Sequence, residues 1–348
     1  MERDKGTRAK SVLGQAAAIL ALAFSFTTVV VLLSGEPPWA AYRYILEGSV
    51  GSWLKVAQVL KVWVPLVLCS CGLLYTFQIG LWNIGVEGQV ILGAIAATAV
   101  LRWGAHWGSP TAVLLLSLLA AVGCGGLWAL AAGLLKTRGG VNEIFAGLGL
   151  NFVAVGVILW LIFGPWKRPG IASMSGTEPF ARELWLPTLA GWRISPYALA
   201  AAVAVLALTW WTLKYTRVGL ACRAIGRNPH ASYLLGLRPD RWMLIAMMLA
   251  GGLAGLAGAY QVVAVYHRLI PAISSNYGYL SLLVVMLANY RLVWIPFIAF
   301  FFAALNVGSI QLPMMLQMDS SLAGVIQGSL VLATLVVHGW ARKREQAS

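Results

Sequence analysis

Charged residues are scarce in this sequence. Only 10% of the 348 residues are Asp, Glu, Lys or Arg, whereas 60% are hydrophobic. Soluble domains carry roughly 25% charged residues, because polar side chains must cover their surface. The shortage excludes a soluble two-domain enzyme and a disordered chain, and it predicts a protein that lies in a membrane.

Catalytic and metal-binding motifs are also missing. The sequence contains no Gly-x-x-x-x-Gly-Lys-Ser/Thr phosphate loop, no His-Glu-x-x-His and no Gly-x-Ser-x-Gly. Its four cysteines and four histidines show no metal-ligand spacing, and so few cysteines do not make a disulfide scaffold. We therefore predict that the chain is not an enzyme, holds no metal or cofactor, and does not hydrolyse nucleotides through a phosphate loop.

Long apolar segments account for most of the chain. A hydrocarbon core about 30 Å thick requires roughly 20 apolar residues in a helix. Ten segments meet or approach this length, which predicts an all-α polytopic membrane protein with about ten transmembrane helices in a single domain, residues 1–348. The segments are residues 11–33, 62–79, 84–101, 111–135, 144–163, 196–213, 243–265, 277–288, 293–310 and 322–337.

The basic residues indicate how these spans are oriented. With the N-terminus in the cytoplasm, 16 of the 25 Lys and Arg residues fall on the cytoplasmic side. Because cytoplasmic loops carry an excess of Lys and Arg, residues 1–10 and 338–348 are predicted to be cytoplasmic termini. The loops at residues 34–61 and 164–195 are then external. The net charge of +14 is therefore mostly an orientation signal, and no nucleic-acid partner is predicted.

Two of the predicted spans are irregular. Residues 62–101 form a long apolar stretch that is interrupted at residues 83–89, and the span at residues 277–288 has only twelve residues. Short or interrupted spans indicate a transport site, because backbone released from a helix can face a cavity.

Glu87 is the most informative residue of the interruption. A charged side chain at the bilayer centre costs about 2.5–3.5 kcal/mol on insertion scales, so such residues usually face a cavity or a partner. Glu87 can line a solute pathway, or its carboxylate can accept backbone N–H groups where the helix breaks, and the sequence leaves both roles open. Asn83 and Gln89 are further candidates for the substrate pathway, because they are polar residues at the same break.

The cytoplasmic segment 214–241 carries its own helix signals. Asn228 and Pro229 suit the N-cap and the first position of a helix, and Gly236 suits a left-handed residue at its end. A second short helix before it is predicted to close at Gly226. Helices this short are marginal in water, so the segment needs either a groove on another subunit or the membrane surface to lie on.

Three other regions have simpler interpretations. Asn142 is expected to cap the helix that follows it, with Glu143 complementing the helix dipole. The small residues at 250–258 allow two helices to approach closely. The external loop 164–195, which is rich in proline and tryptophan, either rests on lipid or is a docking surface for an external partner.

Several stretches of the sequence resemble one family. Residues 80–89 (GLWNIGVEGQ) are similar to the Gly-x-x-Asn-Ile-Gly-x-Glu-Gly-Gln motif of ABC importer permeases for nucleosides and simple sugars. Residues 216–231 resemble the cytoplasmic loop of that family, and residues 141–144 and 325–328 are also similar to it. The stretch at 35–61 resembles the longer of two paired nucleoside permeases. The sequence departs from the family pattern at Trp82, usually Phe, and at Ala288-Asn289-Tyr290, where the pattern has Leu-Gly and a polar or basic residue.

This resemblance implies a vitamin-B12-importer-like (type II) ABC permease fold in the bacterial cytoplasmic (inner) membrane. It also implies three protein partners: a second, similar permease subunit forming a heterodimer, an ATP-binding subunit that holds ATP and Mg, and an external solute-binding lipoprotein or periplasmic protein. The coupling helix of the family corresponds to residues 227–236. The residues implied to couple to the ATPase are Arg223, Gly226, Arg227, Asn228, Pro229, Ala231 and Gly236.

The leading functional hypothesis is a permease subunit of an ABC importer for nucleosides or related simple sugars. The alternative is a stand-alone secondary carrier for a small polar solute, which the shortage of intramembrane carboxylates weakens because no proton relay is evident. A structural or signalling membrane scaffold is a third, weaker hypothesis.

Overall fold

The structure is a computed structural model. It describes residues 37–104, 108–170, 176–188 and 194–316, together with isolated residues between 21 and 35 and between 324 and 336. All the regular elements in these described residues are helices, which confirms the all-α fold class.

The chain divides into two compact units. The terminal unit comprises Met1–Val59 and Phe301–Ser348, and the central unit comprises Leu60–Phe300. Two helices, α3 (Trp53–Gln78) and α12 (Ile295–Ser309), pass from one unit into the other.

The terminal unit contains a helix where the sequence predicts only an external loop. Helix α2 (Pro38–Val50) starts with proline in its first turn, where the missing N–H costs nothing. It packs against α13 (Gln311–Leu316) through a small apolar cluster that includes Ile45 and Leu312. With 13 residues, α2 is too short to cross a hydrocarbon core.

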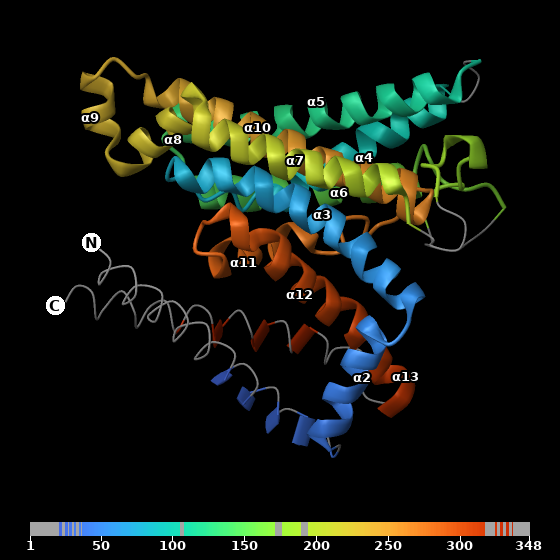
Figure 1. Cartoon of the computed structure of the whole chain (residues 1–348). Coiled ribbons are helices and arrows are strands. Elements are labelled where there is room, and N and C mark those ends of the chain that lie inside the picture. The colour runs from blue at the N-terminus through green and yellow to red at the C-terminus, as the bar shows by residue number, and fades with distance from the viewer. Residues whose placement is uncertain are drawn as a thin grey trace. The chain divides into compact units, whose positions relative to one another are not determined.

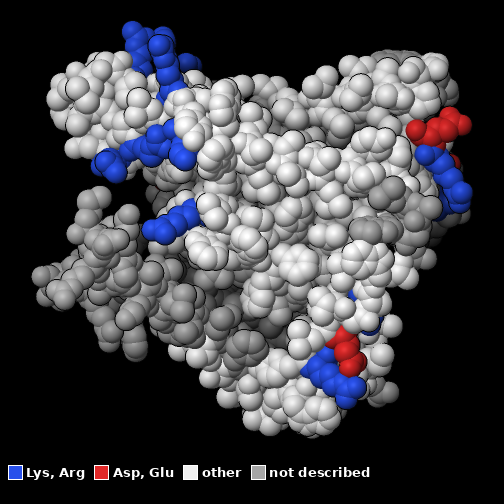
Figure 2. Space-filling view, in the orientation of Figure 1, with Lys and Arg blue, Asp and Glu red and all other residues white. Residues whose placement is uncertain are grey.

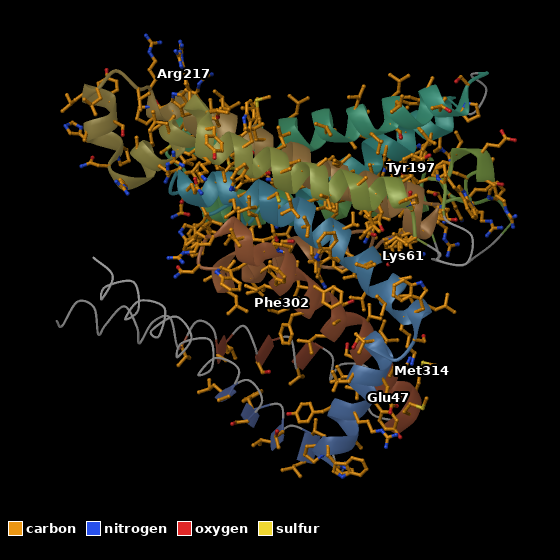
Figure 3. The ribbon with its side chains drawn as sticks, viewed as in Figure 1. Glu47, Lys61, Tyr197, Arg217, Phe302 and Met314 are labelled. Carbon is orange, nitrogen blue, oxygen red and sulfur yellow. The ribbon has the colours of Figure 1, made fainter. Side chains whose placement is uncertain are left out.

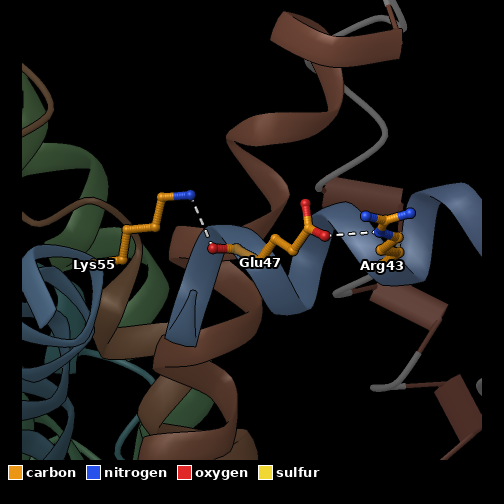
Figure 4. A network of polar contacts seen from close by, with 3 residues as sticks. All are labelled: Arg43, Glu47 and Lys55. Carbon is orange, nitrogen blue, oxygen red and sulfur yellow. Dashed lines mark hydrogen bonds and ion pairs between the residues drawn. The ribbon is translucent and has the colours of Figure 1, made fainter. Parts of the chain in front are cut away.

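Polar contacts stabilise the C-terminal end of α2. The guanidinium of Arg43 donates to the Glu47 carboxylate at 2.7 Å, one helical turn away. The Glu47 carbonyl then accepts from the Lys55 ammonium at 2.9 Å (Figure 4). These contacts link α2 to the first turn of α3 across the turn at Gly51.

The central unit is a bundle of long apolar helices, most of whose axes are roughly aligned (Figure 1). Helices α4, α5 and α10 pack against one another, and α6 packs on α4 and α5. The remaining helices with their bounds are α4 (Val86–Trp103), α5 (Pro110–Thr137), α6 (Glu143–Phe163), η2 (Arg182–Leu184), α7 (Pro196–Tyr215), α8 (Arg217–Arg227), α9 (Pro229–Leu234), α10 (Pro239–Tyr260), η3 (Gln261–Tyr266), α11 (Tyr277–Leu287) and η4 (Leu292–Trp294).

Glycines allow the central helices to approach closely. A Cβ built on Gly125 of α5 would lie 2.8 Å from the Cα of Gly255 of α10, so only glycine fits at this crossing. A Cβ on Gly251 would collide with the backbone of Gly125 in the same way. The small-residue stripe therefore has the packing role that the sequence predicts.

Seven helices in the described part of the chain are long and apolar enough to cross a membrane. They correspond to seven of the ten predicted spans, and the eighth, at 277–288, is the short helix α11. The first and tenth predicted spans, 11–33 and 322–337, lie largely outside the described residues. Exposed side chains on α5, α6 and α7 are mostly apolar, as a lipid-facing surface requires (Figure 3).

Candidate functional site

The predicted interruption in the first irregular span is present as a break between two helices. Helix α3 ends at Gln78, Gly80 follows with φ of +88°, and α4 starts at Val86. Only glycine adopts this left-handed conformation without strain, so Gly80 allows the chain to leave α3 sharply.

Asn83 and Gln89 pair with each other across this break. The Asn83 amide nitrogen donates to the Gln89 side-chain oxygen at 3.0 Å, and the Gln89 amide nitrogen donates back to the Asn83 oxygen at 2.8 Å. Both residues are buried. The reciprocal pair fixes the path of the chain from the end of the break into the first turn of α4.

This pair predicts a strong energetic coupling. We expect Asn83→Ala and Gln89→Ala each to lower the free energy of unfolding by about 1–3 kcal/mol, because each leaves a buried amide without its partner. The double variant should lose clearly less than the sum of the two single variants, since they remove the same interaction. Thermal unfolding of the purified protein in detergent measures both effects, and additive losses would contradict the pairing.

A second break precedes the other irregular span, which forms helix α11. Helix α10 continues as a π-helix, η3, and His267 then takes a left-handed conformation with φ of 54°. An irregular segment follows, and Ser275 and Asn276 are also left-handed before α11 begins. Non-helical backbone of this kind is tolerated at membrane depth only where it is buried in protein or lines a cavity.

Glu87 joins the two breaks. It lies in the first turn of α4 with only 4% of its surface exposed, and its Oε2 accepts the backbone N–H of Gly278 at 2.9 Å. The side chain of Ser274 and the backbone of Asn276 and Tyr279 also interact with the carboxylate. Glu87 therefore sits at the N-terminus of α11, where unpaired N–H groups and the helix dipole favour a carboxylate.

Asn151 of α6 connects both breaks from the opposite side. Its Oδ1 accepts the backbone N–H of Gly88 at 2.8 Å, and its Nδ2 donates to the Ile84 carbonyl at 2.9 Å and to the Tyr279 hydroxyl at 3.0 Å. The residue is buried in the middle of an apolar span. One amide thus satisfies backbone groups that the α3–α4 break leaves unpaired.

A cavity of about 220 Å³ lies among α4, α6 and the start of α11. Its wall brings Glu87 together with polar residues that the sequence analysis did not single out. One of them, Asn151, could have been identified from the sequence, because it is a lone Asn in the apolar span 144–163. The lining residues are Glu87, Ile91, Asn151, Phe152, Val155, Pro271, Ala272, Ser274, Ser275, Asn276 and Tyr279.

Of the three pathway candidates, only Glu87 lines this cavity. The side chains of Asn83 and Gln89 are instead hydrogen-bonded to each other. The two irregular spans that the sequence identified separately are therefore in direct contact, and a cavity with polar and apolar lining residues lies where they meet.

The predicted external loop is hydrogen-bonded to the second break. Backbone N–H groups of Thr177, Phe180 and Leu186 donate to the carbonyls of Leu269, His267 and Val263 at 2.8–3.0 Å. The ring of Trp185 stacks on the His267 ring with centroids 3.7 Å apart. This segment, residues 176–188, supplies donors to carbonyls of η3 and of the irregular backbone that follows it.

The segment 214–241 forms the helices that the sequence predicts. Asn228 caps α9, with its Oδ1 accepting the N–H of Ala231 at 3.0 Å, and Pro229 occupies the first helical position. Gly236 follows the helix with φ of +87°, as expected for a left-handed end residue. Arg223 of α8 donates to the Leu213 carbonyl and so ties α8 to the end of α7.

Gly226 differs from its prediction. It does not close the helix, because it lies within α8, which ends at Arg227 and has Asn228 as its C-cap. A Cβ at Gly226 would instead collide with the carbonyl oxygen of Gln78 and lie 3.3 Å from the backbone carbon of Ile79. The glycine is needed because α8 touches the end of α3 at this point, next to the first break.

The outer surface of the segment is basic and apolar. Tyr233, Leu234 and Leu235 are between 63% and 83% exposed and form a run of three large apolar side chains on the surface. Basic side chains gather at this end of the central unit (Figure 2). The exposed basic residues of the segment are Lys214, Arg217, Arg223, Arg227, Arg238 and Arg241.

Comparison with known proteins gives a consistent result. Residues 55–335 match the family described as branched-chain amino acid transport system / permease component. The glucose ABC transporter permease protein TsgB13 of Haloferax volcanii is 29% identical, over 94% of this chain and 87% of that protein.

Two permease proteins of one bacterium are also similar. The guanosine ABC transporter permease protein NupP of Bacillus subtilis is 27% identical over 87% of both chains. The guanosine ABC transporter permease protein NupQ of the same organism is 28% identical over 66% of this chain and 76% of that protein.

Proposed function

Because the chain belongs to the family of branched-chain amino acid transport system permease components, and is thus the permease subunit of an ABC importer, we propose that it carries nucleosides or related simple sugars. The observation that supports this pathway is the cavity where the α3–α4 break meets the start of α11, because its lining combines polar and apolar residues. Transport proteins commonly place a solute site where helices are discontinuous near the middle of the membrane.

The proposed path of the solute includes the cavity that Glu87 lines. The cavity walls combine amide, hydroxyl and carboxylate groups with apolar side chains. Nucleosides and sugars are uncharged and rich in hydroxyl groups, which such walls can bind without a counter-ion. Asn83 and Gln89 have a supporting role in this proposal, because their pair holds the break on which the cavity depends.

The segment 214–241 is the proposed contact with an ATP-binding subunit, which would hold ATP and Mg. Three exposed apolar side chains at the end of a six-residue helix, in a segment with six exposed basic residues, suit insertion into a groove on another protein. A second permease subunit is proposed because NupP and NupQ, two guanosine permease proteins of one organism, are both similar to this chain. An external solute-binding lipoprotein or periplasmic protein would deliver the solute to the opposite face.

The protein is a membrane protein, and we place it in the bacterial cytoplasmic membrane with both termini inside. The basic end formed by α8, α9 and the start of α10 then lies in the cytoplasm, in agreement with the positive-inside rule.

The proposal is tested by purification and reconstitution. A tagged chain should copurify with an ATPase subunit and a second permease. Proteoliposomes of that complex should take up labelled nucleoside only when ATP is present on the side of the membrane where the ATPase subunit lies. A stand-alone carrier would instead give uptake by this chain alone, driven by an ion gradient. The absence of uptake in either preparation would favour a scaffold.

Loss of the α9 cap should impair transport. We expect Asn228→Ala to reduce ATP-driven uptake at least severalfold, because a lost N-cap costs about 1 kcal/mol and α9 has only six residues to hold its shape. Asn228→Asp should retain most activity, since a carboxylate accepts the same N–H of Ala231. Equal uptake by the alanine and aspartate variants would argue against a role for the capped helix.

A further inference from the structure

The cavity has a polar side and an apolar side. Its polar atoms come from Glu87, Asn151 and the residues at the start of α11, and its apolar wall includes Ile91, Phe152 and Val155. Binding sites for small molecules typically combine apolar walls with a few placed polar groups. The division therefore favours a solute with two unlike faces.

The hydrogen bonds leave one hydroxyl proton available. The Tyr279 oxygen accepts a hydrogen bond from the Asn151 amide, so its own O–H remains to donate. Tyr279 lines the cavity and is 36% exposed. A solute in the cavity would thus meet a phenol that is oriented by Asn151 and presents a donor.

The apolar wall offers an aromatic surface. Phe152 lines the cavity and is 77% exposed, so the protein itself covers little of its ring. An exposed aromatic ring binds flat, apolar groups through offset stacking or edge contacts.

The cavity lacks a partner for negative charge. In the described part of the chain, no Lys, Arg or His side chain is among its lining residues, whereas the carboxyl group of Glu87 is. An anionic solute would give up its hydration without gaining a counter-ion, which is costly in a membrane.

We propose that this cavity is a recognition subsite of the permease itself for uncharged solutes that combine a hydrogen-bond acceptor with a flat apolar ring. Tyr279 and Phe152 determine its specificity, and phosphorylated solutes are excluded. The inference rests on the proposed function and adds that the permease, besides any external binding protein, selects the solute.

The test uses ATP-driven uptake of uridine by the reconstituted complex. Tyr279→Phe removes the hydroxyl, which donates to the solute and accepts from the Asn151 amide, and it should lower kcat/KM about threefold to tenfold, the usual effect of one hydrogen bond. Phe152→Ala should lower it by a similar factor through loss of the aromatic face. The matched controls are Tyr197→Phe on α7 and Phe145→Ala on α6, both exposed and outside the cavity, and these should change kcat/KM less than twofold.

The outcomes separate this inference from the proposed function. Uridine uptake that falls in both cavity variants and not in the controls, with unlabelled UMP failing to compete, supports the subsite. Unchanged kcat/KM in both cavity variants, at normal thermal stability, overturns the subsite while the proposed function stands. Competition by UMP as strong as by unlabelled uridine overturns the exclusion of anions. No ATP-driven uptake of uridine by the wild-type complex contradicts the proposed nucleoside function and the subsite together.

Discussion

Gly226→Ala is expected to reduce ATP-driven uptake more than tenfold while the protein still inserts and assembles. The new methyl group would collide with the Gln78 carbonyl oxygen and would lie 3.0 Å from the Gln78 carbonyl carbon. These are backbone atoms at the end of a long helix, so they cannot turn aside as a flexible side chain could. Helix α8 must therefore shift away from α3 or lose its contact with it.

The contact between Gly226 of α8 and Gln78 of α3 belongs to a series of packed groups that connects segment 214–241 with the cavity. Phe77, one residue before Gln78, packs its ring against Trp82 in the first break, with centroids 5.1 Å apart, and against Tyr290 after α11, at 5.3 Å. The N-terminus of α11 is in turn hydrogen-bonded to Glu87, through the backbone N–H of Gly278. A movement of α8 would thus reach the cavity through a series of packed groups.

The experiment compares uptake with ATP hydrolysis in the same preparation. The expected result is ATP hydrolysis near the wild-type rate with uptake lost, because the catalytic partner is intact and its motion no longer reaches the spans. Gly123→Ala in α5 is the matched control, since it is also a helical glycine, and a Cβ there meets nothing within 4 Å. That variant should keep full uptake and gain up to about 1 kcal/mol of stability from better helix propensity. Normal uptake by Gly226→Ala would contradict a coupling role for the α8–α3 contact.

Gly226 also illustrates what the sequence could and could not predict. Local features were predictable, because an N-cap such as Asn228 or Asn142 bonds an N–H only two or three residues away. A glycine after a helical run signals either a helix end or a close approach, and the sequence alone does not distinguish them. The second meaning applies at Gly226, and it depends on α3, which lies about 150 residues earlier in the chain.

The candidate site shows the same division between local and distant information. Both breaks could be predicted, since polar and glycine residues interrupt one apolar run and the other is too short to span. Their meeting could not, because the bond from Gly278 to Glu87 joins residues 191 apart. The role of Asn151 likewise depends on partners 63, 67 and 128 residues away. Helix α2 escaped prediction because its 13 residues carry no long apolar run.

Replacing Glu87 should have the largest effect on stability and transport together. We expect Glu87→Gln to lower the free energy of unfolding by about 1.5–3 kcal/mol, the range for hydrogen bonds to charged groups. An amide has one oxygen in place of two, so its NH2 group would face N–H and O–H donors from residues 274–279. Uptake should fall more than tenfold, since these residues form one wall of the cavity.

A matched control distinguishes this site from an ordinary carboxylate in a first helical turn. Asp240 holds the corresponding position in α10 and is exposed. Asp240→Asn should cost only about 0.3–1 kcal/mol, the contribution of a favourable charge at a helix N-terminus. A similar loss in the two variants would mean that Glu87 acts only on the helix dipole and does not anchor the second break.

Gly278→Ala tests the same contact from its other side. A Cβ at Gly278 would lie 2.9 Å from both the Cα and the backbone nitrogen of Glu87, so α11 would be pushed away from α4. If Glu87 supports the helix break, Gly278→Ala should lower the stability as Glu87→Gln does. The loss of stability in the double variant should then be far smaller than the sum of the two single losses, because both changes remove the same interaction. If Glu87 contacts only the solute, Glu87→Gln should abolish uptake at an unchanged melting temperature, and the two changes should add. Melting curves of the four proteins, measured beside uptake, therefore decide between the two roles that the sequence left open.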